Sequence, residues 1–334
     1  FSAIMNLPLN GQTVTYSTIS DHEIKLDYYL PGATGRLPAI IYYHGGGMTA
    51  GSRRTVPYPS WLYDHCQEKG YIFISADYRL CHPTTTLDQI DDAKALFKFL
   101  AEDFTQHLPQ SVTLDTARIA VSGFSAGAYS ARAACVYAHP KPAVLLSVYG
   151  LGGDLLLDHW TRGRPPTSIA KFADLDEYPR LFADQTVISD DSEGGTGFSN
   201  RFTLTVQWEL DGTMLDGCFG APGLGAKLNA LDYSQRDAAV PEDLKPGFLQ
   251  SFVTESYPPS VFVHGTADEV VPDQESVHHH EQLVKLGVKS KLCLVKDGPH
   301  GLGDFSAVDE TGSNSTAAAY KEALDFIEGA FAAV

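Results

Sequence analysis

The sequence is poor in cysteine and in basic residues, and it has no long hydrophobic run. Its five cysteines, Cys66, Cys81, Cys135, Cys218 and Cys293, are odd in number and include no C-x-x-C pair, which argues against a disulfide framework and against a zinc or redox site. No apolar stretch approaches the roughly 18 residues of a membrane-spanning helix. Lys and Arg number 24 against 41 Asp and Glu, so the formal net charge of −17 repels nucleic acid and anionic membranes. We therefore expect reduced, buried thiols and a small-molecule ligand, with no nucleic acid and no membrane span.

The first residues do not show the basic segment followed by a hydrophobic segment that is typical of a secretory signal. Together with the cysteine pattern, this favours a cytoplasmic location. The chain begins at Phe1, and a signal peptide removed before that residue stays open as an alternative. A homodimer is compatible with the sequence.

Eight short apolar or alternating runs predict β-strands. They lie at residues 13–19, 23–30, 39–44, 71–78, 118–123, 143–150, 260–265 and 291–296. The first two runs alternate as an antiparallel edge does, and the later ones are continuous β-branched runs typical of a parallel sheet covered on both faces. Helical patterns fill the gaps, one of them beginning with Thr86 and Gln89 at capping-box spacing. The predicted fold is a doubly wound α/β sheet, whose ligands sit beyond the C-terminal ends of the strands.

The connection between the sixth and seventh strands is unusually long, with 109 residues at 151–259. We interpret it as a cap inserted into a core domain made of residues 1–150 and 260–334. Its aromatic residues are Trp160, Phe172, Phe182, Phe198, Phe202, Trp208, Phe219 and Phe252. They either line an apolar roof over a pocket or form the core of the cap itself.

The segment "GFSAG" at 123–127 places Ser125 between two glycines at a strand-to-helix boundary. A serine on such a turn sits in a strained backbone conformation that neighbouring Cβ atoms would obstruct, and Gly123 and Gly127 remove them. This G-x-S-x-G pattern is typical of a nucleophile elbow. Taken alone, it is also compatible with a turn that packs a helix closely on a strand.

A serine hydroxyl needs a base, and the base needs an orienting carboxylate. Asp268 follows the seventh predicted strand in "VHGTADEVVP", and His300 follows the eighth in "KDGPHGLGDF". Since parallel strands end at one edge of a sheet, Ser125, Asp268 and His300 are predicted to meet there as a catalytic triad. Asp273 and Asp297 are the rival orienting acids.

The segment "YYHGGGM" follows the third strand and predicts an oxyanion hole. Glycines let backbone N–H groups approach an oxygen without an intervening side chain. We assign this role to Gly46, Gly47 and Ala126, with Gly45 supporting the loop. His44 is expected to fix the loop by hydrogen bonding instead of acting as a base.

With "DYRL" at 77–80, these motifs resemble the hormone-sensitive-lipase-like (α/β hydrolase-3) carboxylesterases and acetyl esterases. The resemblance spans residues 37–305 apart from the cap, and it implies the α/β-hydrolase fold and a serine hydrolase without cofactor. Many members have Asp and Gly where this chain has Phe124 and Ala128, and the "EVVPD" after Asp268 is seen in other branches. These departures leave the subfamily and the substrate open.

The sequence thus predicts a serine carboxylesterase that cleaves a small neutral or apolar ester through an acyl-enzyme. A lactonase, a thioesterase or a dehydratase or cyclase of small-molecule biosynthesis stays open on the same fold, as does a ligand-binding receptor. The histidines at 278–280 are not expected to bind metal, because adjacent side chains on a helix point in different directions.

Overall fold

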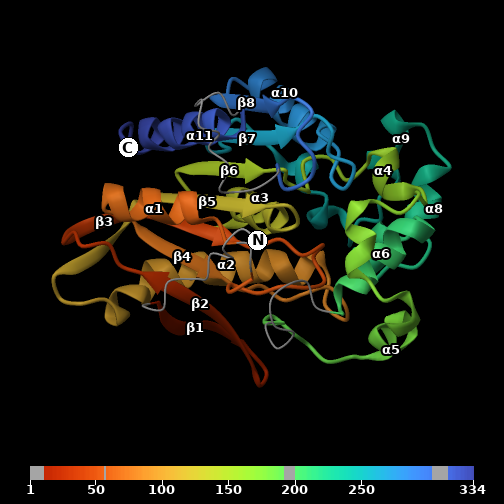
Figure 1. The fold of residues 1–334 in the computed structure, drawn as a ribbon, viewed down its shortest axis with the longest axis horizontal. Coiled ribbons are helices and arrows are strands. Elements are labelled where there is room, and N and C mark those ends of the chain that lie inside the picture. Colours follow the sequence, from red (N-terminus) through yellow and green to blue (C-terminus); the bar gives the residue numbers. More distant parts are fainter. Residues whose placement is uncertain (1–10, 56–57, 192–199, 303–314) are drawn as a thin grey trace.

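The computed structural model describes residues 11–55, 58–191, 200–302 and 315–334. Its centre is one eight-stranded sheet with the strand order β1-β2-β4-β3-β5-β6-β7-β8 (Figure 1). The strands are β1 (Gln12–Ile19), β2 (His22–Tyr29), β3 (Gly35–Tyr43), β4 (Ile72–Ala76), β5 (Val112–Phe124), β6 (Val144–Val148), β7 (Ser260–Gly265) and β8 (Ser290–Val295). The pairs β1–β2 and β2–β4 are antiparallel, and all the other pairs are parallel. The predicted eight-stranded, mostly parallel sheet is confirmed.

Most strand bounds differ from the prediction by one or two residues, and two strands begin at least four residues earlier than predicted. β3 begins at Gly35 and β5 at Val112, because residues 112–114 pair in parallel with residues 35–37. The polar stretch that follows Val112 hides this part of β5 from a search for apolar runs. A register shift between Leu37 and Ala39 separates it from the rest of the ladder.

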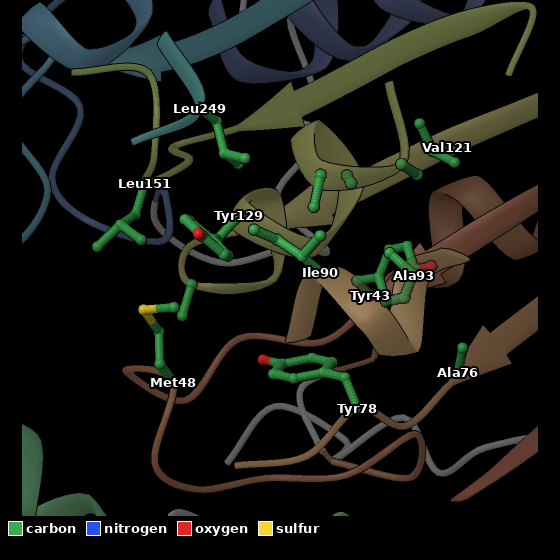
Figure 2. Close-up of a cluster of buried hydrophobic side chains, with 14 of the residues drawn as sticks. Tyr43, Met48, Ala76, Tyr78, Ile90, Ala93, Val121, Tyr129, Leu151 and Leu249 are labelled. Carbon is green, nitrogen blue, oxygen red and sulfur yellow. The ribbon is translucent and has the colours of Figure 1, made fainter. Parts of the chain in front are cut away.

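Helices cover both faces of the sheet. On one face lie α2 (Thr86–Glu102), α3 (Gly127–Tyr137) and α10 (Gln274–Lys285), and on the other lie α1 (Ser60–Lys69) and α11 (Ser315–Phe331). Alternate residues of the buried strands point to the two faces. Ile41 and Tyr43 of β3 therefore join the cluster under α2 and α3, whereas Ile40 and Tyr42 join the one under α1 and α11. Figure 2 shows part of the first cluster, including Tyr43, Ile90 of α2 and Tyr129 of α3.

The predicted capping box of α2 is wrong by one residue. Thr85 is the cap, and its backbone N–H donates to Asp88 Oδ2 at 2.7 Å. Thr86 and Gln89 are buried instead, and the Gln89 amide donates to the carbonyl of Arg79 at 3.0 Å. Two overlapping pairs have capping-box spacing here, and the pair whose side chains are needed inside the protein does not cap the helix.

The segment 151–259 leaves the sheet after β6 and returns at β7. Six α-helices are described in it: α4 (Asp158–Thr161), α5 (Tyr178–Ala183), α6 (Phe202–Asp211), α7 (Met214–Phe219), α8 (Leu224–Asn229) and α9 (Tyr233–Ala239). They gather beyond one end of the sheet, at the right of Figure 1. Of the predicted aromatic residues, Trp160, Phe202, Trp208 and Phe219 are buried, whereas Phe172, Phe182 and Phe252 are partly exposed. Phe198 lies outside the described residues.

All five cysteines are free and buried. None of the helices in the described ranges has both the length and the apolar character needed to cross a membrane.

Candidate active site

A cavity of about 290 Å³ is lined by residues at the C-terminal edge of the sheet and by residues of segment 151–259. Ser125, His300 and the glycines at 45–47 line it from the side of the sheet. Trp160, Phe172, Phe202, Thr205 and Glu209 line it from segment 151–259. The predicted nucleophile, base and oxyanion-loop residues therefore face a largely apolar space.

Ser125 stands on the turn between β5 and α3. Its φ of 52° is in the left-handed region, and its backbone N–H donates to the carbonyl of Val148 at 3.0 Å. A Cβ on Gly123 would overlap the backbone of Ala128, and one on Gly127 would overlap the carbonyl of Tyr43. The two glycines are therefore required by close backbone packing, and the strained turn turns the Ser125 hydroxyl towards the cavity.

Three side chains from three strand ends form one hydrogen-bonded line. Ser125 Oγ is 3.0 Å from His300 Nε2, and His300 Nδ1 is 2.8 Å from Asp268 Oδ2. The side chain of His300 is 15% exposed, and that of Asp268 is fully buried. The base therefore meets the cavity, while the carboxylate is shielded behind it.

The rival acids take other positions. Asp273 immediately precedes α10, and the exposed Asp297 donates its backbone N–H to Thr266 Oγ1 at 2.9 Å. The carboxylate that His300 Nδ1 contacts is that of Asp268. Only Asp268 of the three is thus placed to orient the imidazole.

Asp268 is held by three donors, with the imidazole of His264 beside them. The backbone N–H groups of Val270 and Val271 each donate to Oδ1 at 2.9 Å, and His264 Nε2 lies 3.3 Å from Oδ2 beside His300. Burial alone would raise the pKa of this carboxyl, but the hydrogen bonds from His264 and His300 lower it well below its usual range. The carboxylate is therefore ionised at neutral pH.

The contact between His264 and Asp268 was missed at the sequence level. His264 lies buried in β7, as expected of a packed strand residue, and its Nδ1 is 2.7 Å from Ser276 Oγ. The only signal for its place beside the carboxylate is the spacing in "HGTAD", where the two residues stand four apart. A second missed residue is Tyr149, whose ring packs edge-on against that of His300 with centroids 5.0 Å apart.

The glycine loop after β3 stands next to the serine. Gly46 and Gly47 have φ values of 120° and 63°, and a Cβ on Gly45 would lie 3.2 Å from the Cβ of Ser125. In the described part of the chain, no protein acceptor takes a hydrogen bond from the N–H groups of Gly46, Gly47 or Ala126. These N–H groups are therefore available to an oxygen bound in the cavity.

His44 supports this loop, and its imidazole does not point to the serine. It is fully buried, stacks on Tyr78 with ring centroids 4.5 Å apart, and donates from Nδ1 to the carbonyl of Gly45 at 2.7 Å. Burial lowers the pKa of His44 to about 4. A neutral, stacked imidazole of this kind fixes a backbone turn.

Thr205 of α6 ties segment 151–259 to the glycine loop. Its hydroxyl donates to the carbonyl of Gly47 at 2.8 Å and lies 2.7 Å from the hydroxyl of Thr49. A Cβ on Gly47 would overlap the Thr205 side chain. Thr205 thus contacts both the carbonyl and the Cα position of Gly47.

The three histidines at 278–280 have separate partners. His278 Nδ1 lies 2.6 Å from Asp154 Oδ2, His279 Nδ1 accepts from Arg132 Nε at 3.0 Å, and His280 Nδ1 lies 2.8 Å from Ser290 Oγ. Within the residues that the structure describes, no group of three or more His, Cys, Asp or Glu side chains is arranged to hold a metal ion.

Solved structures share this architecture. Carboxyl esterase 2 from the fungus Tuber melanosporum superposes with a TM-score of 0.59 at 17% identity, covering 96% of this chain and 87% of that one. Esterase 2 of Thermogutta terrifontis, phosphoramylated by tabun, gives 0.55 at 18% identity, covering 96% and 93%. The chain has the α/β-hydrolase fold. The α/β-hydrolase fold predicted from the motifs is thereby confirmed.

Sequence comparisons match parts of this chain. The BD-FAE family matches residues 26–141. Carboxylesterase NlhH of Mycobacterium tuberculosis is 31% identical over 121 residues, which are 36% of this chain and 35% of that protein. The non-reducing polyketide synthase trt4 of Aspergillus terreus is 26% identical over 328 residues, which cover 86% of this chain. The chain spans only 13% of the length of that synthase.

Proposed function

We propose that the protein is a serine hydrolase that cleaves a carboxylic ester through an acyl-enzyme. The observation that carries the proposal is the line from Ser125 to His300 to Asp268, with its two contacts of 3.0 and 2.8 Å, at the wall of the cavity. The similarity to proteins named carboxylesterase supports the same reaction.

In the proposed mechanism, His300 Nε2 takes the proton of the Ser125 hydroxyl as Oγ attacks the ester carbonyl. The N–H groups of Gly46, Gly47 and Ala126 bind the oxygen that becomes negative, and Asp268 stabilises the imidazolium. The same proton then passes from His300 to the leaving alcohol. Water, deprotonated by His300, next attacks the acyl carbon and releases the acid and Ser125.

We further propose that residues 151–259 act as a cap over a core of residues 1–150 and 260–334. Trp160, Phe172 and Phe202 of this segment line the same cavity as the nucleophile. An apolar wall of this kind favours a small neutral or apolar ester, because burial of its carbon atoms against aromatic rings contributes binding free energy.

A thioester is the second candidate substrate. It is favoured by one observation, the match of 86% of this chain to polyketide synthases that are far longer than the chain. The triad would attack a thioester carbonyl in the same way and release a thiol instead of an alcohol.

The two candidates are separated by comparing kcat/KM for esters with kcat/KM for thioesters. We expect p-nitrophenyl esters of two to ten carbons to be hydrolysed, and an organophosphate to stop the reaction by adding its phosphoryl group to the Ser125 peptide, as read by mass spectrometry. Hydrolysis of acyl thioesters of the same chain lengths is measured by the thiol that it releases. The substrate class with the higher kcat/KM is the favoured one. Protein that turns over neither series and carries no phosphoryl group on Ser125 would contradict acyl transfer altogether.

Thr205 provides a test of the oxyanion loop. Thr205→Val keeps the volume but leaves the Gly47 carbonyl without its donor, so we expect kcat for ester hydrolysis to fall about 10-fold with little change in KM. Thr205→Ser restores a hydroxyl and should recover most of the loss. An unchanged kcat in the Val variant, measured at saturating ester, would show that the loop is positioned without this contact.

A further inference from the structure

The cap side of the cavity contains a buried carboxylate that the proposed mechanism does not use. Glu209 of α6 lines the same cavity as Ser125, and its side chain is only 7% exposed. Its Oε1 is 2.7 Å from Arg164 Nη2. Within the described residues, no donor bonds the other oxygen, Oε2, and this oxygen is not among the fully buried atoms that lack a partner. Because Glu209 lines the cavity, Oε2 can accept a hydrogen bond from a bound group in exchange for one from water.

The partner of Glu209 is itself fixed by the loop that follows Asp268. Arg164 Nη1 donates to the carbonyl of Glu269 at 2.7 Å, and Nη2 donates to that of Val270 at 3.3 Å. The guanidinium also lies over the ring of Trp160, 5.9 Å from its centroid. Arg164 therefore neutralises the carboxylate and holds it in one position. The guanidinium is itself fixed by these contacts and does not move with a bound ligand.

The surroundings decide which ligand group suits Glu209. The neighbouring walls are apolar, with Trp160, Phe202 and Met214 among the lining residues. An anionic group would be repelled by the carboxylate. A cationic group would leave a net positive charge beside an ion pair that is already neutral, because Arg164 balances Glu209. A neutral donor remains, and the simplest is a hydroxyl.

Titration of the carboxyl agrees with this geometry. Burial raises the pKa of Glu209 to about 7, against the opposing effect of Arg164. A hydroxyl that donates to the carboxylate would stabilise the ionised form and lower this pKa. Binding measurements at pH 8 therefore address the ionised side chain.

We propose that Glu209 selects substrates by accepting a hydrogen bond from a hydroxyl group remote from the ester. This inference rests on the ester hydrolysis proposed above and adds its substrate class: an apolar ester that carries one neutral hydroxyl in its acyl or alcohol part. Lys171 provides a control, because it also lines the cavity with a charged side chain but is exposed to solvent, unlike Glu209.

The test compares three versions of each p-nitrophenyl ester at pH 8: the hydrocarbon acyl chain, its ω-hydroxy derivative and the methyl ether of that derivative, in chains of six to ten carbons. A second series consists of acetate esters of alcohols that carry the same three groups, and its hydrolysis is followed by acid release. In the wild type, the hydroxy ester of the right length should exceed its methyl ether in kcat/KM by about 10- to 100-fold. Glu209→Gln keeps an acceptor for Arg164 but presents an amide donor to the cavity, so hydroxyl and ether should differ by less than about threefold. Lys171→Met should keep the wild-type ratio.

Binding to an inactive background separates this inference from the reaction itself. The ethyl esters of the same acids and the acetate esters of the same alcohols are titrated into Ser125→Ala and Ser125→Ala/Glu209→Gln by calorimetry. A hydroxyl preference that Glu209→Gln removes supports the inference, even if wild type hydrolyses no ester and the proposed function fails. Ser125-dependent hydrolysis with the same hydroxyl-to-ether ratio in wild type and Glu209→Gln, in both series, would overturn the inference and leave the proposed function intact.

Discussion

Ser125→Ala is expected to lower ester turnover about a million-fold, the loss measured when the nucleophile of a serine hydrolase is removed. Alanine cannot form the acyl-enzyme, and His300 then has no hydroxyl to deprotonate. The substitution is mild for the fold, because the Ser125 hydroxyl bonds to His300 alone among the described residues. Alanine would occupy the same backbone conformation at position 125, with its φ of 52°, as serine does. Residual activity would come from the N–H groups of the glycine loop acting on bound water.

Ser130→Ala is the matched control for this experiment. Ser130 lies on α3 close to the elbow, is fully buried, and its hydroxyl has no hydrogen-bond partner among the described residues. Its loss should leave kcat/KM and organophosphate labelling unchanged. Initial rates with p-nitrophenyl esters and intact-protein mass after labelling measure both variants. Ser125→Ala protein that hydrolyses ester at the wild-type rate would refute the acyl-enzyme.

The fold could be predicted because the sheet is buried on both faces. A strand such as β7, covered by helices on each side, is a continuous apolar run bounded by turn residues, and its prediction at 260–265 matches the structure. β5 shows the limit of this reasoning. Its first residues pair with the start of β3, and a polar sequence there carries no period that would indicate a strand.

The candidate site could be predicted only where residues follow strand ends. Parallel strands fix the direction of the chain, so Ser125, Asp268 and His300 could be placed at one edge from their order alone. Thr205 and Glu209 could not be placed in this way. Thr205 meets Thr49 across 156 positions of sequence, and α6 contacts the glycine loop through tertiary packing that no local pattern records. Residues of segment 151–259 therefore needed coordinates before they could be assigned to the cavity.

Asp268→Asn is expected to lower kcat/KM for esters about 10,000-fold. The two N–H groups of Val270 and Val271 require an acceptor at Oδ1, so the amide oxygen of asparagine takes that position. The NH₂ group then faces His300 and His264, where the carboxylate oxygen was. To accept this bond, His300 Nδ1 must lose its proton, and the proton moves to Nε2. An imidazole protonated at Nε2 cannot take the proton of Ser125.

Stability should change together with activity. The pKa of Asp268 lies below its usual range in the folded protein, so ionised Asp268 stabilises the fold above about pH 4, and the contribution is lost as the pH falls further. Asp268→Asn removes it at neutral pH, and thermal unfolding at pH 7 should show a lower Tm, with a smaller difference between variant and wild type at acidic pH.

Asp297→Asn separates the loss of one particular carboxylate from a general effect of charge. Asp297 is exposed and has a φ of 56°, a conformation that asparagine adopts readily. It precedes His300 in the same loop, so both substitutions remove one negative charge near the base. We expect Asp297→Asn to keep kcat/KM within about twofold of wild type, because no proton position on His300 depends on it. Equal losses in the two variants would mean that His300 is oriented by something other than Asp268, and the proposed triad would then be wrong.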